Sequence, residues 1–187
     1  MTALVPPYEA TLPQRAELPA VPVVRGAEAC RCPEHLCEVV AQFHVATAPR
    51  YAPRDGNTYC NIFAWDFTCA MGCEVPHWVD SEGNPTKPGN GRELTINATL
   101  DWLRSDAGLE RGWRECGAVE AEAQASNGHP VLAVLREVPH GHVAVVMPSR
   151  PNHPGLYVSQ AGGRCLEDEP LANGFGSKGP VLFFFHP

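Results

Sequence analysis

Apolar positions in the first two thirds of the chain recur at helical spacing. The segment 34–45 (EHLCEVVAQFHV) and the segment 60–72 (CNIFAWDFTCAMG) each carry an apolar stripe with steps of three and four residues. Similar patterns predict a helix at 95–106 and an alanine-rich helix at 118–126. Gly72 is a typical stop for the second of these helices. Four helices are therefore expected before residue 127.

The pattern changes to short apolar or alternating runs after residue 128. These runs lie at 130–135 (PVLAVL), 141–147 (GHVAVVM), 156–160 (LYVSQ) and 180–185 (PVLFFF). Each is bounded by Gly, Pro, Asn or Ser, as strands are. Helices followed by a run of strands predict an α+β fold with a largely antiparallel sheet.

Polar, proline-rich segments separate these elements. Residues 1–26 contain five prolines and no sustained apolar run, which predicts an extended N-terminal arm ahead of a single domain at 27–187. The arm lacks the basic start and apolar stretch of a signal peptide, so we expect synthesis in the cytoplasm. No stretch approaches the roughly 18 to 20 apolar residues of a membrane span.

Composition narrows the classes of function. Lys and Arg number 14 and Asp and Glu 21, so the formal net charge of the 187 residues is −7. Binding of nucleic acid requires a clustered surplus of Lys and Arg, so this charge balance argues against a nucleic-acid partner. Eight cysteines and eight histidines leave disulfides, metal binding or thiol catalysis as the questions to resolve.

Cys60 has the most favourable position for catalysis among the cysteines. It stands at the start of a predicted helix, with Asn57 and Thr58 as candidate N-caps. The helix dipole and unpaired N–H groups at such a position lower the pKa of a thiol and can bind an oxyanion. The pattern therefore predicts Cys60 as a nucleophile.

A base and an orienting residue follow on two predicted strands. On the strand that begins near His142, the side chains of His142, Ala144 and Val146 share one face. Small Ala144 would let the Cys60 helix approach that face and reach the imidazole. Gln160 on the next strand could hold the imidazole in the useful tautomer. This arrangement predicts a papain-like thiol hydrolase.

These motifs resemble those of the CHAP and NlpC-like cysteine hydrolases. The resemblance rests on NTYCN at 57–61, GHVAVV at 141–146 and Gln160, and it covers roughly residues 50–187. It implies a papain-like fold, with Cys60 as nucleophile, His142 as general base and acid, and Gln160 as orienter. Many of these enzymes carry Asn, Asp, Glu or His at the third position. The chain also lacks a recognisable cell-wall-binding repeat.

The resemblance further implies the substrate and the reaction. Such enzymes cut amide bonds of peptidoglycan, either as N-acetylmuramoyl-L-alanine amidases or as endopeptidases in the stem peptide, through a thioester and without a cofactor. We expect Tyr59, Asn61, Trp65 and Trp78 to line the cleft, with core packing as the alternative for the two tryptophans. Asp66 points to another helix face and is expected to be structural.

The biological setting stays open between two cases. A wall hydrolase without a signal peptide is typical of a phage lysis enzyme or of an antibacterial toxin exported by an injection machine. The toxin case adds a cognate immunity protein as partner. In both cases the enzyme acts on the cell wall of another cell or after phage delivery.

The remaining cysteines leave other functions open. Cys30, Cys32, His35 and Cys37 form a cluster that does not have the usual spacing of a zinc site. Free thiols, one or two disulfides, or zinc would each be compatible with the sequence, although we expect no metal. One alternative is thus a non-catalytic interaction module stabilised by zinc or disulfides. Another is a thiol protease or deamidase that acts on a protein.

Overall fold

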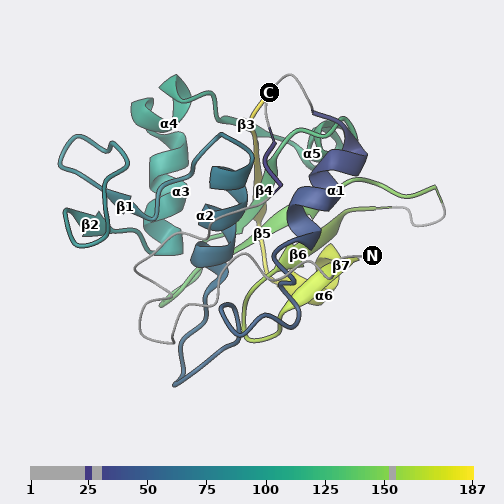
Figure 1. Ribbon diagram of the computed structural model, residues 1–187, viewed down its shortest axis with the longest axis horizontal. Helices are drawn as coiled ribbons and strands as arrows, with labels where there is room; N and C mark the ends of the chain where they lie inside the picture. Colours follow the sequence, from purple (N-terminus) through teal and green to yellow (C-terminus); the bar gives the residue numbers. More distant parts are fainter. Residues whose placement is uncertain (1–23, 27–30, 152–154) are drawn as a thin grey trace.

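A six-stranded antiparallel sheet organises the chain (Figure 1). The computed structural model describes residues 24–26, 31–151 and 155–187, so most of the arm expected at 1–26 lies outside the described residues. In spatial order the strands are β3 (Arg114–Cys116), β8 (Val181–Phe185), β4 (Val131–Leu135), β5 (His142–Met147), β6 (Tyr157–Gln160) and β7 (Leu166–Pro170). A separate two-stranded ribbon pairs β1 (Trp78–Val79) with β2 (Arg92–Glu93).

Helices cover both faces of the large sheet. They are α1 (Pro33–Ala41), α2 (Cys60–Ala70), α3 (Ile96–Arg104), α4 (Asp106–Glu110), α5 (Ala118–Ser126) and α6 (Leu171–Phe175). The apolar residues of α1, α2 and α3 form one buried cluster on one face, and those of α5 and α6 form a second cluster on the other. An α+β architecture with a mainly antiparallel sheet is thus confirmed.

Strand β4 shows how the sheet divides the core. All five of its residues are buried, but they alternate between the two clusters: Leu132 and Val134 face α2, whereas Val131, Ala133 and Leu135 face α5. A strand buried on both faces has a continuous apolar sequence, as PVLAVL does. The pairing with β5 transfers the same alternation to the strand that carries His142.

Helix α2 lies against β5 and ends as its sequence indicates (Figure 1). Gly72 follows the helix with φ +72°, the left-handed conformation that favours glycine. The N–H of Cys73 then closes the turn onto the carbonyl of Thr68 at 3.0 Å. The start differs from the prediction, because Tyr59 is the N-cap and makes no side-chain cap bond. Neither Asn57 nor Thr58 caps this helix.

The elements that the sequence pattern missed are short or polar. Strands β3 and β7 lie at the two edges of the sheet, and their sequences REC and LEDEP carry charges toward solvent. Charged edge strands are a common protection against edge-to-edge association. Their formation depends on the neighbouring strands β8 and β6, which explains why a hydrophobic pattern does not reveal them.

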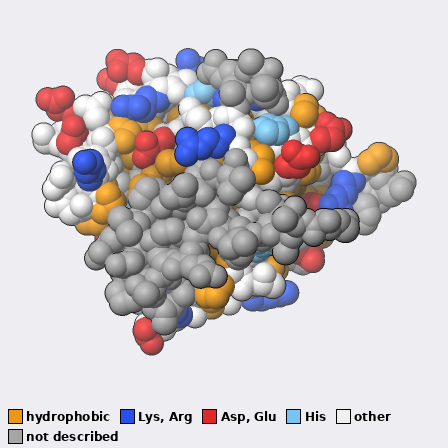
Figure 2. All heavy atoms as spheres, viewed as in Figure 1, with side chains coloured by type: hydrophobic (Ala, Val, Ile, Leu, Met, Phe, Trp, Pro, Cys, Tyr) orange, Lys and Arg blue, Asp and Glu red, His pale blue; other side chains and the backbone are white. Residues whose placement is uncertain are grey.

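The described surface mixes charges of both signs. Figure 2 shows acidic and basic side chains interspersed over the described part of the visible face. Among the helices in the described ranges, none combines the length and the apolar character that crossing a membrane would require.

Candidate functional site

Cys60 occupies the first turn of α2 and is 4% exposed. The N–H of Phe63 bonds to the carbonyl of Tyr59, and the N–H of Ile62 is taken by the side chain of Asn61 at 3.0 Å. The N–H groups of Cys60 and Asn61 have no acceptor among the described backbone and side-chain oxygens. The helix start therefore leaves two N–H groups beside the sulfur.

Burial dominates the electrostatics of the thiol. It raises the pKa of Cys60 above the ordinary value of a cysteine. The N–H groups of Val143, Asn61 and Cys60 and the hydroxyl of Thr58 oppose this shift without reversing it. The N–H groups of the helix start thus lower the pKa of the thiol as expected, but desolvation outweighs them and the net shift is upward. Cys60 is a neutral thiol at neutral pH.

His142 and Gln160 are paired directly. His142 Nε2 lies 2.7 Å from Gln160 Oε1, and the Gln160 amide nitrogen donates to the carbonyl of Arg164 at 3.3 Å. An amide oxygen only accepts, so Nε2 carries the proton and Nδ1 is left as the basic nitrogen. Gln160 is 3% exposed, and a side chain at Gly174 would collide with it. Gln160 therefore lies on the strand beside His142, within hydrogen-bond distance of its imidazole.

The imidazole of His142 is poised to stay neutral. Burial lowers its pKa below the usual 6.5, with the bond to Gln160 and the charge of Glu137 acting in the opposite direction. Its ring lies 5.0 Å from the ring of Phe175 in α6. Because the pKa of Cys60 is raised and that of His142 lowered, the resting state is a neutral thiol beside a neutral base.

The start of β5 links Cys60 to the strand of His142, but through another face of that strand than the sequence predicts. His142 pairs with Leu135 and shares the face of Ala144, but α5 covers that face. Helix α2 packs instead against Val143 and its neighbours on the opposite face. The prediction that Ala144 admits the Cys60 helix is therefore wrong, because alanines of α5 fill that space.

The link between α2 and the strand of His142 is a backbone one. The N–H of Val143, the residue after His142, acts on the Cys60 sulfur. No hydrogen bond joins the sulfur to the imidazole in the described structure. Catalytic hydrogen bonds are commonly long without substrate and shorten when it binds.

A pocket of about 150 Å³ opens at the thiol. Its walls come from the turn before α2, the start of α3 and the loop between β4 and β5. The lining residues are Gly56, Asn57, Thr58, Cys60, Asn61, Thr95, Ile96, His140 and Gly141. The contributions of α3 and of the β4–β5 loop were not predicted, because both segments lie far from Cys60 in the sequence.

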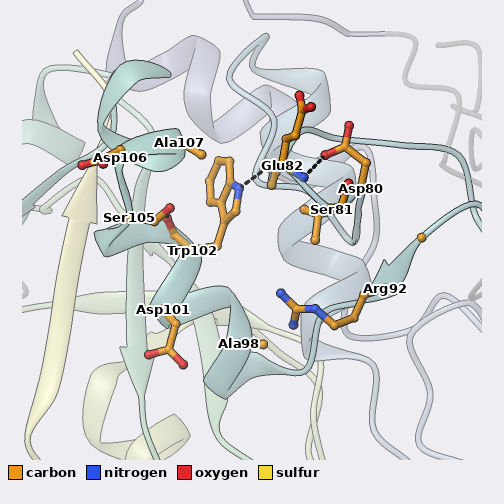
Figure 3. Close-up of a pocket in the computed structure, with 13 residues that line it drawn as sticks. Asp80, Ser81, Glu82, Arg92, Ala98, Asp101, Trp102, Ser105, Asp106 and Ala107 are labelled. Carbon is orange, nitrogen blue, oxygen red and sulfur yellow. Dashed lines mark hydrogen bonds between the residues drawn. The ribbon is translucent and has the colours of Figure 1, made fainter.

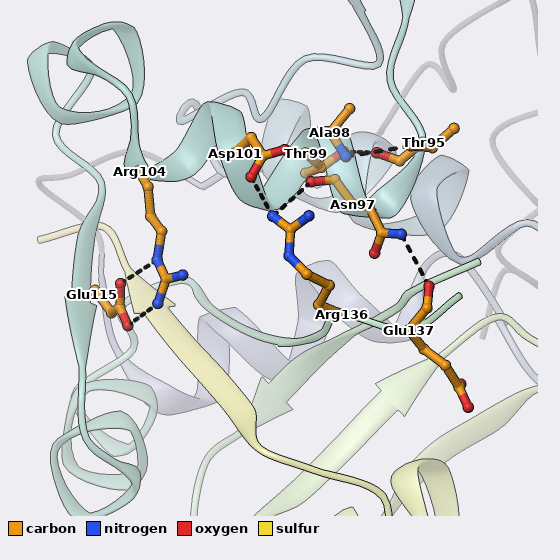
Figure 4. A network of polar contacts seen from close by, with 9 residues as sticks. All are labelled: Thr95, Asn97, Ala98, Thr99, Asp101, Arg104, Glu115, Arg136 and Glu137. Atoms are coloured by element: carbon orange, nitrogen blue, oxygen red, sulfur yellow. Dashed lines mark hydrogen bonds and ion pairs between the residues drawn. The ribbon is translucent and has the colours of Figure 1, made fainter. Parts of the chain in front are cut away.

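Polar contacts hold that loop against α3 (Figure 4). Asn97 donates through Nδ2 to the carbonyl of Glu137 at 3.0 Å. Arg136 pairs with Asp101, and Glu137 pairs with Lys178 at 2.7 Å. These contacts join the segment that leads into His142 to α3 and to Lys178.

The expected substrate-binding residues divide into two groups. Asn61 lines the pocket at Cys60. Tyr59 does not line it, and Arg54 lies over its ring at 4.7 Å. Trp65 is 5% exposed and donates to Glu74 at 2.9 Å, and half-buried Trp78 lies at the start of β1. The two tryptophans pack beside His77 and leave the pocket at Cys60 to smaller polar side chains.

Asp66 has the structural role that its helix face predicts. It is 1% exposed and accepts from Arg50 Nε at 2.6 Å, from Arg50 Nη2 at 2.9 Å and from the hydroxyl of Tyr51 at 2.8 Å. Arg50 and Tyr51 come from the segment 46–58, which the sequence pattern indicates only as a loop.

A larger open pocket of about 740 Å³ lies between the β1–β2 ribbon and α3 (Figure 3). Trp102 forms part of its wall and donates through Nε1 to the carbonyl of Gly83 at 2.8 Å. Acidic side chains line it, among them Asp80, Glu82 and Asp106. Cys60, His142 and Gln160 are not among its lining residues.

The cysteines of the described ranges form no disulfide with one another. Seven cysteines, Cys60 included, lie there, and Cys30 lies outside these ranges. In the same part of the chain, no three His, Cys, Asp or Glu side chains gather as a metal ion would require. The N-terminal cysteine cluster is therefore only partly described, with Cys32 and Cys37 both exposed.

The chain matches no protein-family model and no curated protein sequence. Its chemistry has to be judged from the geometry of the site.

Proposed function

We propose that this protein is a papain-like cysteine hydrolase that cuts amide bonds in bacterial peptidoglycan, as a stem-peptide endopeptidase or an N-acetylmuramoyl-L-alanine amidase. The observation that supports this most is the 2.7 Å pair of His142 and Gln160 at the strand end where the first turn of the Cys60 helix arrives. Nucleophile, base and orienter come from α2, β5 and β6, in the order that the CHAP and NlpC-like resemblance implies.

The proposed reaction is acyl transfer through a neutral thiol. As the sulfur of Cys60 attacks the amide carbonyl, its proton passes to Nδ1 of His142, and the backbone N–H of Cys60 donates to the oxyanion. The imidazolium then protonates the leaving amine, and the C–N bond breaks to give a thioester. Water, deprotonated by His142, attacks the thioester, so that a carboxylic acid leaves and the thiol is restored. No cofactor takes part.

The shape of the pocket supports a peptide-like substrate. Its walls offer amide and hydroxyl groups from Asn57, Thr58, Asn61 and Thr95, which suit the polar backbone of a short peptide. The net charge of −7 gives no long-range attraction to anionic wall polymer, so recognition rests on these short-range contacts. In the toxin setting, an immunity protein would bind over this pocket. In the phage setting, no such partner is needed.

Degradation of purified sacculi tests the proposal. Wild type releases soluble fragments whose masses identify the scissile bond. Cys60→Ala releases none, whereas Cys69→Ala, a change at the other end of the same helix, keeps the activity. Mass spectrometry of the fragments and thermal unfolding of each variant complete the experiment.

Two results would reject the cell-wall proposal in different ways. Equal release by wild type and Cys60→Ala would remove Cys60 as nucleophile. Intact sacculi, together with cleavage or deamidation of a protein substrate that needs Cys60, would favour the protein-directed thiol enzyme. A thiol at position 60 no more reactive than the other thiols, together with loss of folding on chelation, would favour the non-catalytic module.

A further inference from the structure

A buried histidine on the β1–β2 ribbon faces the residue that follows the nucleophile. His77 directly precedes β1, is 2% exposed and lies 5.3 Å from Trp65, ring centre to ring centre. Its Nδ1 is 3.4 Å from the side-chain nitrogen of Asn61. Neither His77 nor the ribbon takes part in the reaction proposed above.

Glu93 of β2 faces the other side of the His77 ring. Its Oε1 lies 2.9 Å from Nε2, and Nε2 has no hydrogen bond among the described residues. The side-chain nitrogen of Asn61 can only donate, so Nδ1 is the acceptor and the proton lies on Nε2, toward Glu93. Burial lowers the pKa of His77 to about 4, and the ring is therefore neutral at neutral pH.

The side chain of Asn61 is held at both ends. Its oxygen accepts the N–H of Ile62 at 3.0 Å while its nitrogen donates to His77. The side chain of Asn61 thus occupies the N–H of Ile62. The N–H groups of Cys60 and Asn61 are directed at the Cys60 sulfur. Asn61 also lines the pocket that opens at Cys60.

We propose that His77, with Glu93 behind it, is a positioning residue that fixes the Asn61 amide and so keeps the N–H groups of the α2 start available to the Cys60 sulfur. This inference rests on Cys60 being the nucleophile of the proposed function. It assigns the β1–β2 ribbon a part in the reactivity of the thiol, without contact with the reacting atoms.

The test compares variants by the rate at which iodoacetamide alkylates Cys60 in the native protein, resolved from the other cysteines by peptide mass spectrometry. His77→Phe keeps a ring between Trp65 and Trp78 but loses the acceptor. We expect it to slow alkylation of Cys60, and release of fragments from sacculi, by about tenfold, because small displacements of reacting groups carry large rate effects. His77→Asn, which keeps an acceptor near the place of Nδ1, should recover most of the rate.

A double-mutant cycle separates positioning from general support of the fold. If His77 acts through Asn61, His77→Phe has no further effect on alkylation in an Asn61→Ala background. Additive effects of the two changes, an unchanged alkylation rate in His77→Phe, or equal losses in His77→Phe and His77→Asn would each overturn the proposal. Alkylation needs no substrate, so a protein that shows the coupling but leaves sacculi intact would refute the cell-wall function alone.

Discussion

Asp66 and Cys60 are two buried side chains of helix α2 whose surroundings differ in kind. Asp66, in the middle of the helix, is 1% exposed and accepts three hydrogen bonds from Arg50 and Tyr51. Cys60, at the start, is 4% exposed, has no side-chain cap above it and borders a pocket. The carboxylate of Asp66 is fully engaged by neighbouring side chains. The sulfur of Cys60 has only backbone N–H groups and the hydroxyl of Thr58 beside it.

The difference indicates which end of the helix serves stability and which serves chemistry. A buried charge is tolerated only with a partner, so the Arg50–Asp66 pair ties the segment 46–58 to the helix. A helix start without a cap costs stability, about 1 kcal/mol where a good cap is replaced. We expect this loss of stability because the N–H groups of the first turn of α2 have no side-chain cap and can donate to the proposed nucleophile and to an oxyanion.

Removal of the buried carboxylate should have the largest effect on stability. Asp66→Ala leaves the Arg50 guanidinium buried without its counter-charge, which typically costs about 3–5 kcal/mol. Urea unfolding followed by circular dichroism measures the change. A loss of unfolding free energy below about 1 kcal/mol is typical of exposed pairs. It would show that water solvates Arg50 and that Asp66 and Cys60 do not differ as proposed.

Loss of the orienting amide should lower the rate and leave the fold intact. We expect Gln160→Ala to reduce the rate of fragment release by about 10- to 100-fold, less than the full contribution of general-base catalysis, because the imidazole itself is kept. Gln160→Glu keeps an acceptor but places a negative charge at Nε2, which raises the pKa of His142. The acid limb of its pH–rate profile should therefore move to higher pH, whereas an unshifted limb would place the essential base elsewhere.

The pH dependence should reflect a base that titrates below its usual value. His142 must be neutral to accept the proton of Cys60, and burial lowers its pKa. The rate should therefore fall as pH decreases through a value below 6.5. A limb above 6.5 would contradict the neutral resting pair.

Stability should decrease with acid over a related range. His77 has a folded pKa of about 4 and an unfolded value near 6.5, so the unfolded chain binds more protons between these values. The free energy of unfolding should fall as pH drops from 6.5 to 4, and His77→Phe should reduce that slope. Urea unfolding at a series of pH values measures both.

The smallest effect is expected at an exposed pair. Arg104 donates to both carboxylate oxygens of Glu115, at 2.7 and 2.6 Å, yet both side chains are more than 40% exposed (Figure 4). Glu115→Gln should cost less than about 1 kcal/mol because solvent screens the pair. A cost equal to that of Asp66→Ala would mean that burial does not decide the worth of these ion pairs.

The helices and strands that hold the candidate site could be predicted because their own residues carry the pattern. The stripe of α2, the glycine that ends it and the apolar runs of β5 and β6 are local features. The helix cap and the face of β5 met by α2 were predicted wrongly. Local sequence favours Asn57 or Thr58 as the cap, but the chain turns so that Tyr59 takes that place. Similarly, Ala144 suits a close helix, and only packing shows that this helix is α5.

By itself, the sequence determined the type and order of α1, α2, α3, α5, β4, β5, β6 and β8, and it singled out Cys60, His142 and Gln160. Hydrophobic period and residue chemistry are local properties of the chain, which is why they could be used. Tertiary structure decided how deeply each polar side chain is buried and which partner it has. Burial depends on segments that are distant in the sequence. At Cys60, burial raises the pKa of the thiol, although the N–H groups at the start of α2 lower it. The same packing brought Arg50 to Asp66 and His77 to Asn61, pairings that no spacing could reveal.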